Sequence, residues 1–527
     1  MVVVSAKEMR QLDELTIAKG TPGYVLMERA GEGATATLLK RFPDVHGRRV
    51  VIVAGKGNNG GDGFVMARLL AGKGVNAEVV LLGRAADVRG DAARALAGLQ
   101  GTPVRVGELV EPKDMRLLTD AFGGASVLVD AVFGTGLNAD VTGLHADVLG
   151  RMNRCGVPIF SVDIPSGLDA DRGRPLGVSI EATATATLGF AKIGEVIYPG
   201  LQYVGDLSII DIGIASAAVG EVRPQVSLLE PRDVAAYVPQ RPAEAHKGTC
   251  GHVLVLAGSR GHSGAGLMAA HAACRGGAGL TTLAGPASLN VIFSLGIPEV
   301  MTAALPDADG SIRFDRASLD SLLEGKQAIV VGPGIGTHAD ACSLIDHVLG
   351  VADIPVVVDA DGLTCLSGLL DRLATTKAQV ILTPHPGEMA RLIEGDVRSV
   401  QDDRVGTARG FAQKYGCVVV LKGARTVIAA ADGKVWINPT GNPGMASGGM
   451  GDILGGLIGA LLAQGLAPAA AACLAAYVHG VAADAIADEA GPIGMRASDV
   501  AERLPGTFKL LLVDARARRF STARAGG

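Results

Sequence analysis

A glycine-rich stretch near the end of the chain, residues 438–463, surrounds a single acidic residue, Asp452. Glycine lets a backbone approach a ligand closely, because it has no Cβ and tolerates positive φ. The apolar run that follows predicts a helix, whose N-terminus offers free N–H groups and a positive dipole end suited to phosphate. A carboxylate repels phosphate, so Asp452 favours another role, the removal of a proton from a hydroxyl beside the phosphate. The alternative is that Asp452 only caps the helix.

A similar stretch near the start of the chain, NNGGDG at residues 58–63, places two amides and an acid among three glycines. Its backbone offers donors for phosphate, and its side chains offer oxygen ligands for a cation. Residues 55–60 also match the pattern G-x-G-x-x-G, but Leu82-Gly83-Arg84 stands where the next strand should end on a ribose-binding acid. We therefore do not expect an ordinary dinucleotide redox site. A tight turn with a helix cap is the alternative.

Two further acids end consecutive predicted strands in the first half of the chain. Asp130 is followed by Gly134-Thr-Gly136, and Asp163 is followed by Pro165-Ser-Gly167. Each acid alone could be a turn or cap residue. Together with the NNGGDG stretch on neighbouring strand ends, they predict a common cleft that holds a hard cation through oxygen ligands or uses one carboxylate as a proton shuttle.

In the second half, two polar segments leave predicted strands. The segment HPGE, residues 385–388, follows the strand 379–383, although His385 could also be a satisfied structural residue. Lys422–Thr426 offers basic and backbone donors to phosphate or ribose. With the glycine-rich stretch around Asp452, these segments predict a nucleotide site. Neither a P-loop motif nor the protein-kinase signature set is present.

The elements that must position these residues alternate between strand and helix. Residues 49–83 predict a strand, a Gly/Asn loop over 55–63, a helix over 64–73 and a second strand, which is a βαβ unit. More strand–loop units follow, and a second α/β series begins after a proline-rich segment around 220–240. We therefore expect two α/β domains. In such sheets ligands bind beyond the carboxyl ends of the strands, where nearly all the motifs above stand.

Composition narrows the function classes. The 527 residues carry a net charge of −5 without a Lys/Arg cluster, so we do not expect nucleic acid as a partner. The seven cysteines are scattered singly, which argues against structural zinc and a disulfide framework. The N-terminus lacks the features of a signal peptide. The apolar stretch 453–483 is interrupted by Gly, Pro and Gln, which predicts two buried helices rather than a membrane span. A cytoplasmic location fits these features.

Taken together, the motifs resemble those of the bifunctional NAD(P)H-hydrate repair enzymes, and the resemblance covers nearly the whole chain. In the first half it rests on MRQLDELTI, LMERAG, AGKGNNGGDGF, DAVFGTGL and VDIPSGLDAD. In the second half it rests on HKGTCGHVLVLAGS, SGAGLMAAHAACRGGAGL, GPGIG, TPHPGEM, LKGARTVI and NPGMASGGMGD.

The resemblance implies an N-terminal Rossmann-like three-layer domain over residues 1–220 and a C-terminal ribokinase-like α/β domain over residues 230–520. The substrate would be NADH or NADPH that has gained water across a double bond of the nicotinamide ring. The first domain would interconvert the R and S epimers of this hydrate. The second would dehydrate the S epimer with a nucleoside phosphate, releasing AMP and phosphate if ADP is used.

The resemblance also implies roles for individual residues. Asp163 would carry the proton transfer of the epimerase, and Asp452 would accept the hydroxyl proton in the dehydratase. The epimerase substrate loops would be Asn58, Asn59, Gly60, Gly61 and Asp62 together with Gly134, Thr135, Gly136, Leu137, Asn138, Ala139 and Asp140. Potassium would be bound by Asn59, Asp130 and Ser166. Contacts to the hydrate in the second domain would come from Ala265, Gly336, His385 and Asp452, and the nucleotide site from Lys422, Gly423, Ala424, Arg425, Thr426 and Gly451.

The expected cofactors and partners are potassium in the first domain, ADP or ATP with Mg²⁺ in the second, and the hydrates of NADH and NADPH. We expect the protein to form a homo-oligomer and to bind neither nucleic acid nor a membrane. Two rival functions share parts of this pattern. A small-molecule kinase of the ribokinase-like class would release a stable phosphorylated product, and a nucleotide sensor would bind without turnover.

Overall fold

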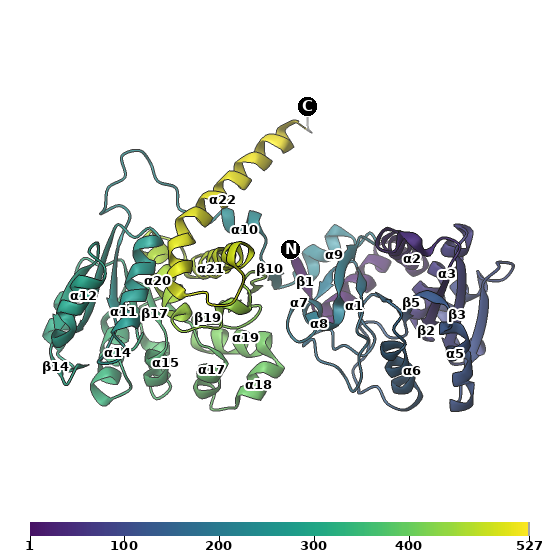
Figure 1. Cartoon of the computed structure of the whole chain (residues 1–527), viewed down its shortest axis with the longest axis horizontal. Helices are drawn as coiled ribbons and strands as arrows, with labels where there is room; N and C mark the ends of the chain where they lie inside the picture. The colour runs from purple at the N-terminus through teal and green to yellow at the C-terminus, as the bar shows by residue number, and fades with distance from the viewer. Residues whose placement is uncertain (525–527) are drawn as a thin grey trace. The chain divides into compact units, whose positions relative to one another are not determined.

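The computed structural model describes residues 1–524 and divides into two compact units. Residues 2–226 form the first unit, and the second begins at residue 227 and includes Met1. Each unit is built on its own sheet (Figure 1).

The first unit contains a seven-stranded parallel sheet with helices on both faces (Figure 1). In spatial order its strands are β4 (Arg105–Leu109), β3 (Asn76–Leu82), β2 (Arg49–Ala54), β5 (Ala125–Ala131), β6 (Ile159–Val162), β7 (Ala184–Leu188) and β9 (Asp206–Ile210). The short strand β1 (Val2–Val4) pairs in parallel with β8 (Ala191–Lys192).

Strand β2 contributes side chains to a hydrophobic core on each face of this sheet. Val50 and Ile52 pack into a core with α2 (Gly23–Arg41) and α3 (Asn58–Gly72), whereas Val51 packs into a separate core on the opposite face. Such a strand is apolar throughout because neither face meets water. The other helices of the unit are α1 (Ala6–Ala18), α4 (Gly90–Ala97), α5 (Arg116–Phe122), α6 (Gly143–Arg154), α7 (Ile193–Val196), α8 (Leu201–Val204) and α9 (Ser216–Val222).

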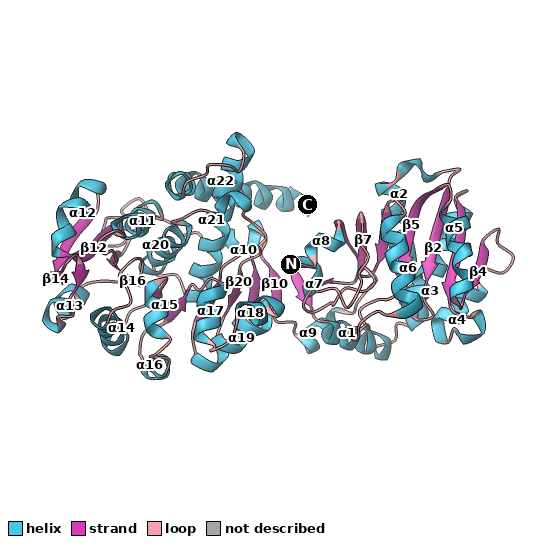
Figure 2. Ribbon diagram, turned by 60° about the horizontal axis from the view of Figure 1, so that its bottom comes forward, coloured by secondary structure: helices cyan, strands magenta, loops and turns pink. Residues whose placement is uncertain are grey.

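The parallel strands of the second unit follow the same order, and further strands extend this sheet beyond them (Figure 2). Its parallel strands are β13 (Met301–Leu305), β12 (Leu280–Pro286), β11 (His252–Leu256), β16 (Ala328–Val331), β17 (Val356–Val358), β18 (Val380–Leu382) and β19 (Val418–Leu421). The antiparallel strands β20 (Val427–Ala429) and β21 (Val435–Ile437) extend it, and β10 (Val226–Leu228) lies beside β21. A small hairpin joins β14 (Asp307–Ala308) to β15 (Ser311–Ile312).

Three helices cover one face of the second sheet: α11 (Ser263–Arg275), α20 (Met450–Ala463) and α21 (Pro468–Ala490). Helix α22 (Ala497–Arg524) packs on these helices (Figure 1). Helix α20 is almost entirely buried, which explains why its sequence is apolar all round. The other helices are α10 (Pro231–Ala235), α12 (Asn290–Gly296), α13 (Arg316–Leu323), α14 (Ala339–Val351), α15 (Asp361–Leu366), α16 (Asp371–Thr375), α17 (Pro386–Leu392), α18 (Val397–Asp402) and α19 (Arg404–Tyr415).

Both sheets have a point where the strand order reverses, between β2 and β5 in the first unit and between β11 and β16 in the second. Loops leave neighbouring strands in opposite directions there, which opens a crevice at the carboxyl ends of the strands. The predicted α/β fold of both halves is confirmed, and the first sheet has the strand order of a Rossmann fold.

Two expectations about local structure need correction or refinement. The predicted loop over residues 55–63 is wrong in its second half, because helix α3 already begins at Asn58. The stretch 453–483 does form two helices, α20 and α21, as predicted. Within the described residues, α21 alone is long and apolar enough to cross a membrane, and 67% of its most apolar window is buried inside the protein.

One disulfide joins Cys342 in α14 to Cys365 in α15, and five cysteines are free. Spacing along the chain did not reveal this pair, which is 23 residues apart. The two Cα atoms come within 4.9 Å because α14 and α15 follow the neighbouring strands β16 and β17.

Candidate active sites

A cavity of about 700 Å³ lies in the first unit and takes in the strand ends at the switch point. This volume is within the usual range for a site that takes a small molecule. Nine of the predicted substrate residues line it: Asn58, Asn59, Asp62, Gly134, Thr135, Gly136, Leu137, Asn138 and Asp163.

The other four predicted substrate residues do not line this cavity: Gly60, Gly61, Ala139 and Asp140. The two glycines serve packing instead. A Cβ on Gly60 would lie 1.9 Å from the carbonyl oxygen of Gly55, and one on Gly61 would lie 2.6 Å from Cε of Met27. These glycines therefore let the first turn of α3 press against the preceding loop and against α2.

Asp163 occupies an unusual backbone conformation at the end of β6, with φ of 67°. Its Oδ1 lies 2.5 Å from the ammonium Nζ of Lys192, and its Oδ2 accepts a hydrogen bond of 3.2 Å from the backbone N–H of Thr135. Positive φ is costly for a non-glycine residue and persists where the surroundings enforce it. The side chain is thus held toward the cavity with one oxygen paired to a cation.

Lys192 is fully buried and donates in three directions. Besides Asp163, its Nζ contacts Oγ1 of Thr187 at 2.7 Å and the carbonyl oxygen of Leu188 at 3.2 Å. Nearby, Oε2 of Glu195 accepts hydrogen bonds from the hydroxyl of Thr187 and the backbone N–H of Lys192. Burial raises the pKa of Glu195 to about 7, although the attraction of Lys192 opposes this shift.

Lys192 was not among the predicted site residues. A lysine at the end of the otherwise uncharged run of β7 and β8 was a usable signal, because an unpaired buried ammonium is very costly and predicts a carboxylate partner. That partner could not be identified from spacing, since it lies 29 residues away on another strand end.

Three more carboxyl groups line the same cavity, those of Asp62, Asp13 and Asp91. Asp62 is buried in the first part of α3, and burial raises its pKa well above the usual value, with a further increase from the charges of Asp163 and Asp13. Asp13 comes from α1, and burial, with a further contribution from Asp163, raises its pKa to about 6. The cavity wall therefore holds one carboxylate paired with an ammonium and two carboxyl groups whose pKa burial raises.

Behind the cavity, Asp130 is completely buried at the end of β5. Ser166 contacts it twice, through Oγ at 2.5 Å and through the backbone N–H at 2.8 Å, and Oγ of Ser161 donates at 2.9 Å. Burial raises the pKa of Asp130 above its usual value, although these hydrogen bonds oppose that shift. Within the described part of the chain, the side-chain oxygen and nitrogen of buried Asn59 have no hydrogen-bond partner. An oxygen-rich cluster with an unsatisfied amide suits a hard cation.

In the second unit, Asp452 is the third residue of α20, and the cap position is taken by Gly449 with φ of 90° and no side-chain hydrogen bond. The alternative that Asp452 caps the helix is therefore wrong. Burial raises its pKa to about 7, with the charge of Asp359 adding to the shift and that of Lys422 opposing it. A carboxyl group with this pKa can accept a proton near neutral pH.

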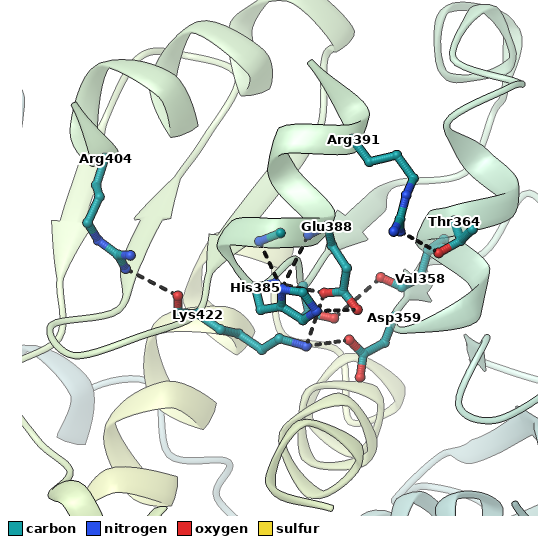
Figure 3. Close-up of polar contacts among 10 residues, drawn as sticks. Val358, Asp359, Thr364, His385, Glu388, Arg391, Arg404 and Lys422 are labelled. Atoms are coloured by element: carbon teal, nitrogen blue, oxygen red, sulfur yellow. Dashed lines mark hydrogen bonds and ion pairs between the residues drawn. The ribbon is translucent and has the colours of Figure 1, made fainter. Parts of the chain in front are cut away.

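Lys422 lies at the centre of the second site (Figure 3). Its Nζ is 2.7 Å from Oδ1 of Asp359 and 3.7 Å from Oε2 of Glu388. Burial disfavours the charged ammonium, but these two carboxylates outweigh that effect and raise its pKa. Gly451 completes the contact, because a Cβ there would lie 3.2 Å from the same ammonium. The predicted nucleotide residues Lys422 and Gly451 thus meet across the site.

The rest of the predicted nucleotide segment, Gly423, Ala424, Arg425 and Thr426, forms the turn between β19 and β20. Gly423 has φ of 140°, and the hydroxyl of Thr426 donates to its carbonyl oxygen. Behind the turn, buried Arg404 donates to the carbonyl oxygens of Leu421 and Lys422 (Figure 3). The guanidinium therefore holds the end of β19 from inside the protein.

His385 has a structural role as well as an exposed edge. Its Nδ1 accepts hydrogen bonds from the backbone N–H groups of Gly387 and Glu388, which caps α17 (Figure 3). With Nδ1 acting as acceptor, the proton of the neutral ring belongs on Nε2. The ring is 56% exposed, so its Nε2–H can still reach a ligand.

Of the remaining predicted contacts, Ala265 lies in α11 and Gly336 lies in the loop after β16. A Cβ on Gly334 would lie 3.1 Å from that of Ala265, and the backbone N–H of Gly336 donates to Oδ2 of Asp361. Asp359 and Asp361 were not among the predicted site residues, and Glu388 was predicted only as part of the segment 385–388. The two aspartates stand directly after β17, the same strand-end position that drew attention to Asp130.

Comparison with known proteins covers both units. A model described as the YjeF-related protein N-terminus matches residues 23–194, and one described as NAD(P)H-hydrate dehydratase matches residues 253–506. A bifunctional NAD(P)H-hydrate repair enzyme of Moorella thermoacetica is 41% identical over 97% of both chains. Its Escherichia coli counterpart is 35% identical over 90% of this chain and 88% of that protein.

Among solved structures, an ADP/ATP-dependent NAD(P)H-hydrate dehydratase from Bacillus subtilis, co-crystallised with ATP and Mg²⁺, is 33% identical. It covers 54% of this chain and 99% of its own, with a TM-score of 0.48. Because relatives above 30% identity span nearly the entire chain, this protein belongs to the family of bifunctional NAD(P)H-hydrate repair enzymes.

Proposed function

We propose that the first unit epimerises the hydrates of NADH and NADPH and that the second unit dehydrates the S epimer with ADP or ATP. The domain limits 1–220 and 230–520 belong to this proposal, as do the roles of the individual site residues. The observation that carries it is Asp452, a carboxyl group with a pKa of about 7 at the start of a buried helix, beside the ammonium of Lys422.

In the second unit, Lys422 and the turn through Thr426 bind the phosphates of the nucleotide, and Mg²⁺ enters with it. Asp452 takes the proton of the hydrate hydroxyl as that oxygen bonds to the terminal phosphorus of the nucleotide. The carbon–oxygen bond then breaks, phosphate leaves, and loss of a proton from the neighbouring carbon restores the ring double bond. With ADP the products are NADH or NADPH, AMP and phosphate.

In the first unit, the hydrate binds in the cavity, and Asp163 transfers a proton. Lys192 supports this role because its buried ammonium lies 2.5 Å from Oδ1 of Asp163 and holds that side chain in place at the cavity wall. Asn59, Asp130 and Ser166 would hold potassium, which supplies fixed positive charge to a buried carboxylate. The donor set supports this assignment, since Asp130 has hydrogen bonds but no cationic partner among the described residues.

The proposal is tested with chemically prepared NADPH hydrate that contains both epimers, in the presence of potassium, Mg²⁺ and either ADP or ATP. Complete return of NADPH absorbance with one nucleotide would establish both activities and identify the phosphate donor. A stop at the S-epimer fraction would show an inactive first unit. No recovery from a folded protein that binds ADP would favour a small-molecule kinase, whose phosphorylated product mass spectrometry would detect.

The expected cellular setting also belongs to this proposal. We expect a cytoplasmic homo-oligomer that acts on small molecules and binds neither nucleic acid nor a membrane. Size-exclusion chromatography with light scattering on the full chain measures the number of subunits.

A further inference from the structure

Two carboxyl groups on the wall of the first cavity have opposite surroundings. Asp163 has an ammonium against one oxygen and a backbone N–H against the other. Asp62 is only 6% exposed, and within the described residues its side chain has neither a hydrogen-bond partner nor a cation in ion-pair contact. Burial without such partners disfavours the charged form and raises the pKa of Asp62 well above its usual value.

Two neighbouring charges also raise the pKa of Asp62, because Asp163 and Asp13 repel a negative charge on its carboxyl group. Lys192 has the opposite effect, but its ammonium already donates to Asp163, Thr187 and Leu188. The other ionisable groups on the cavity wall are Arg10 of α1, Lys56 after β2, Asp91 of α4 and His145 of α6. The pair Asp62 and Asp163 therefore presents one acid and one base to the same cavity.

The chemistry of the hydrate requires such a pair. Addition of water to an enamine double bond places the hydroxyl on the carbon next to nitrogen, so the stereocentre bears both an oxygen and the ring nitrogen. Its configuration inverts most directly if the carbon–nitrogen bond opens and closes again. Opening needs a base for the hydroxyl proton and an acid for the departing nitrogen.

We propose that Asp62 is the proton donor that works opposite Asp163 in epimerisation, an inference that rests on the proposed function of the first unit. Asp163 removes the hydroxyl proton, and the electrons of that O–H bond form an aldehyde carbonyl. The carbon–nitrogen bond breaks with its electron pair on nitrogen, which takes the proton of Asp62. Rotation about the neighbouring carbon–carbon bond presents the other face of the aldehyde. Ring closure then returns both protons, so only the configuration changes.

The test measures kcat/KM for epimerisation against pH in the full-length enzyme, with dehydration of pure S epimer as a check on folding. Wild type should show a bell-shaped profile, since Asp163 must be ionised and Asp62 protonated. In Asp62→Asn we expect the rate to fall by about 10²–10⁴ and the high-pH limb to disappear. Asp44→Asn, an exposed aspartate of the same unit, is the matched control and should match wild type.

Asp62→Glu keeps an ionisable acid and should retain the high-pH limb with part of the rate, and it serves as the second variant if Asp62→Asn does not fold. A slow Asp62→Asn enzyme that keeps the limb would overturn the inference, because Asp62 would then only shape the cavity. Wild-type rates in Asp62→Asn would overturn it as well. A wild-type enzyme that dehydrates the S epimer but never converts the R epimer would instead contradict the proposed function of the first unit.

Discussion

The pH dependence of dehydration follows from the surroundings of Asp452. A general base must be ionised to accept a proton, and burial, reinforced by the charge of Asp359, raises the pKa of this carboxyl group to about 7. The ionised fraction is then about 0.01 at pH 5, about one half at pH 7 and about 0.9 at pH 8. We therefore expect kcat/KM for dehydration to rise about 90-fold between pH 5 and pH 8 and to level off above pH 8.

A second variant tests the cause of this shift. Asp361 also raises the pKa of Asp452, and its Oδ2 accepts from the backbone N–H of Gly336. Asp361→Asn removes the charge and keeps an oxygen that can accept that hydrogen bond. The midpoint of the profile should therefore move to lower pH. In Asp452→Asn, the rate should drop by about 10²–10⁴ and lose this pH dependence.

The assay uses epimerically pure S hydrate, so that the first unit does not limit the rate, and follows the return of NADPH absorbance in buffers of constant ionic strength. The quantity to compare is kcat/KM, because it reports groups of the free enzyme. Circular dichroism at each pH confirms that the protein stays folded. A flat profile between pH 5.5 and 8, or an Asp452→Asn enzyme within tenfold of wild type, would refute the role of Asp452 as the base.

Three further experiments test other parts of the two sites. Asp163→Asn should lower epimerisation by about 10²–10⁴ and leave dehydration of pure S epimer unchanged, whereas loss of both activities in a folded protein would argue against separate sites. Gly134→Ala would place a Cβ 2.8 Å from Oδ2 of Asp163, so chiral chromatography should show at least about tenfold slower epimerisation, with a melting temperature close to that of wild type. Lys422→Met leaves the buried carboxylate of Asp359 without its counter-ion and should destabilise the second unit by about 3–5 kcal/mol in urea unfolding. The double variant Lys422→Met/Asp359→Asn should recover most of that loss, and fully additive effects would contradict the pairing.

Much of the architecture followed from local patterns. The pattern of residues 49–83 predicted a βαβ unit, and glycines with acids after predicted strands predicted sites at strand ends. The prediction worked because the period of apolar residues and the turn residues are local properties. It erred at Asn58–Gly63, where glycines suggested a loop although they permit close helix packing.

The sequence by itself determined the fold class, the family and the strand ends on which the candidate residues stand. Only the tertiary structure decided which of those residues meet. The pairs Asp163–Lys192 and Asp359–Lys422 join positions 29 and 63 residues apart, and the disulfide joins two cysteines that no motif connects. The ionisation of Asp62 and Asp452 depends on burial and on charges from distant parts of the chain. Such contacts are set by the order of strands in the sheet, which local patterns do not encode.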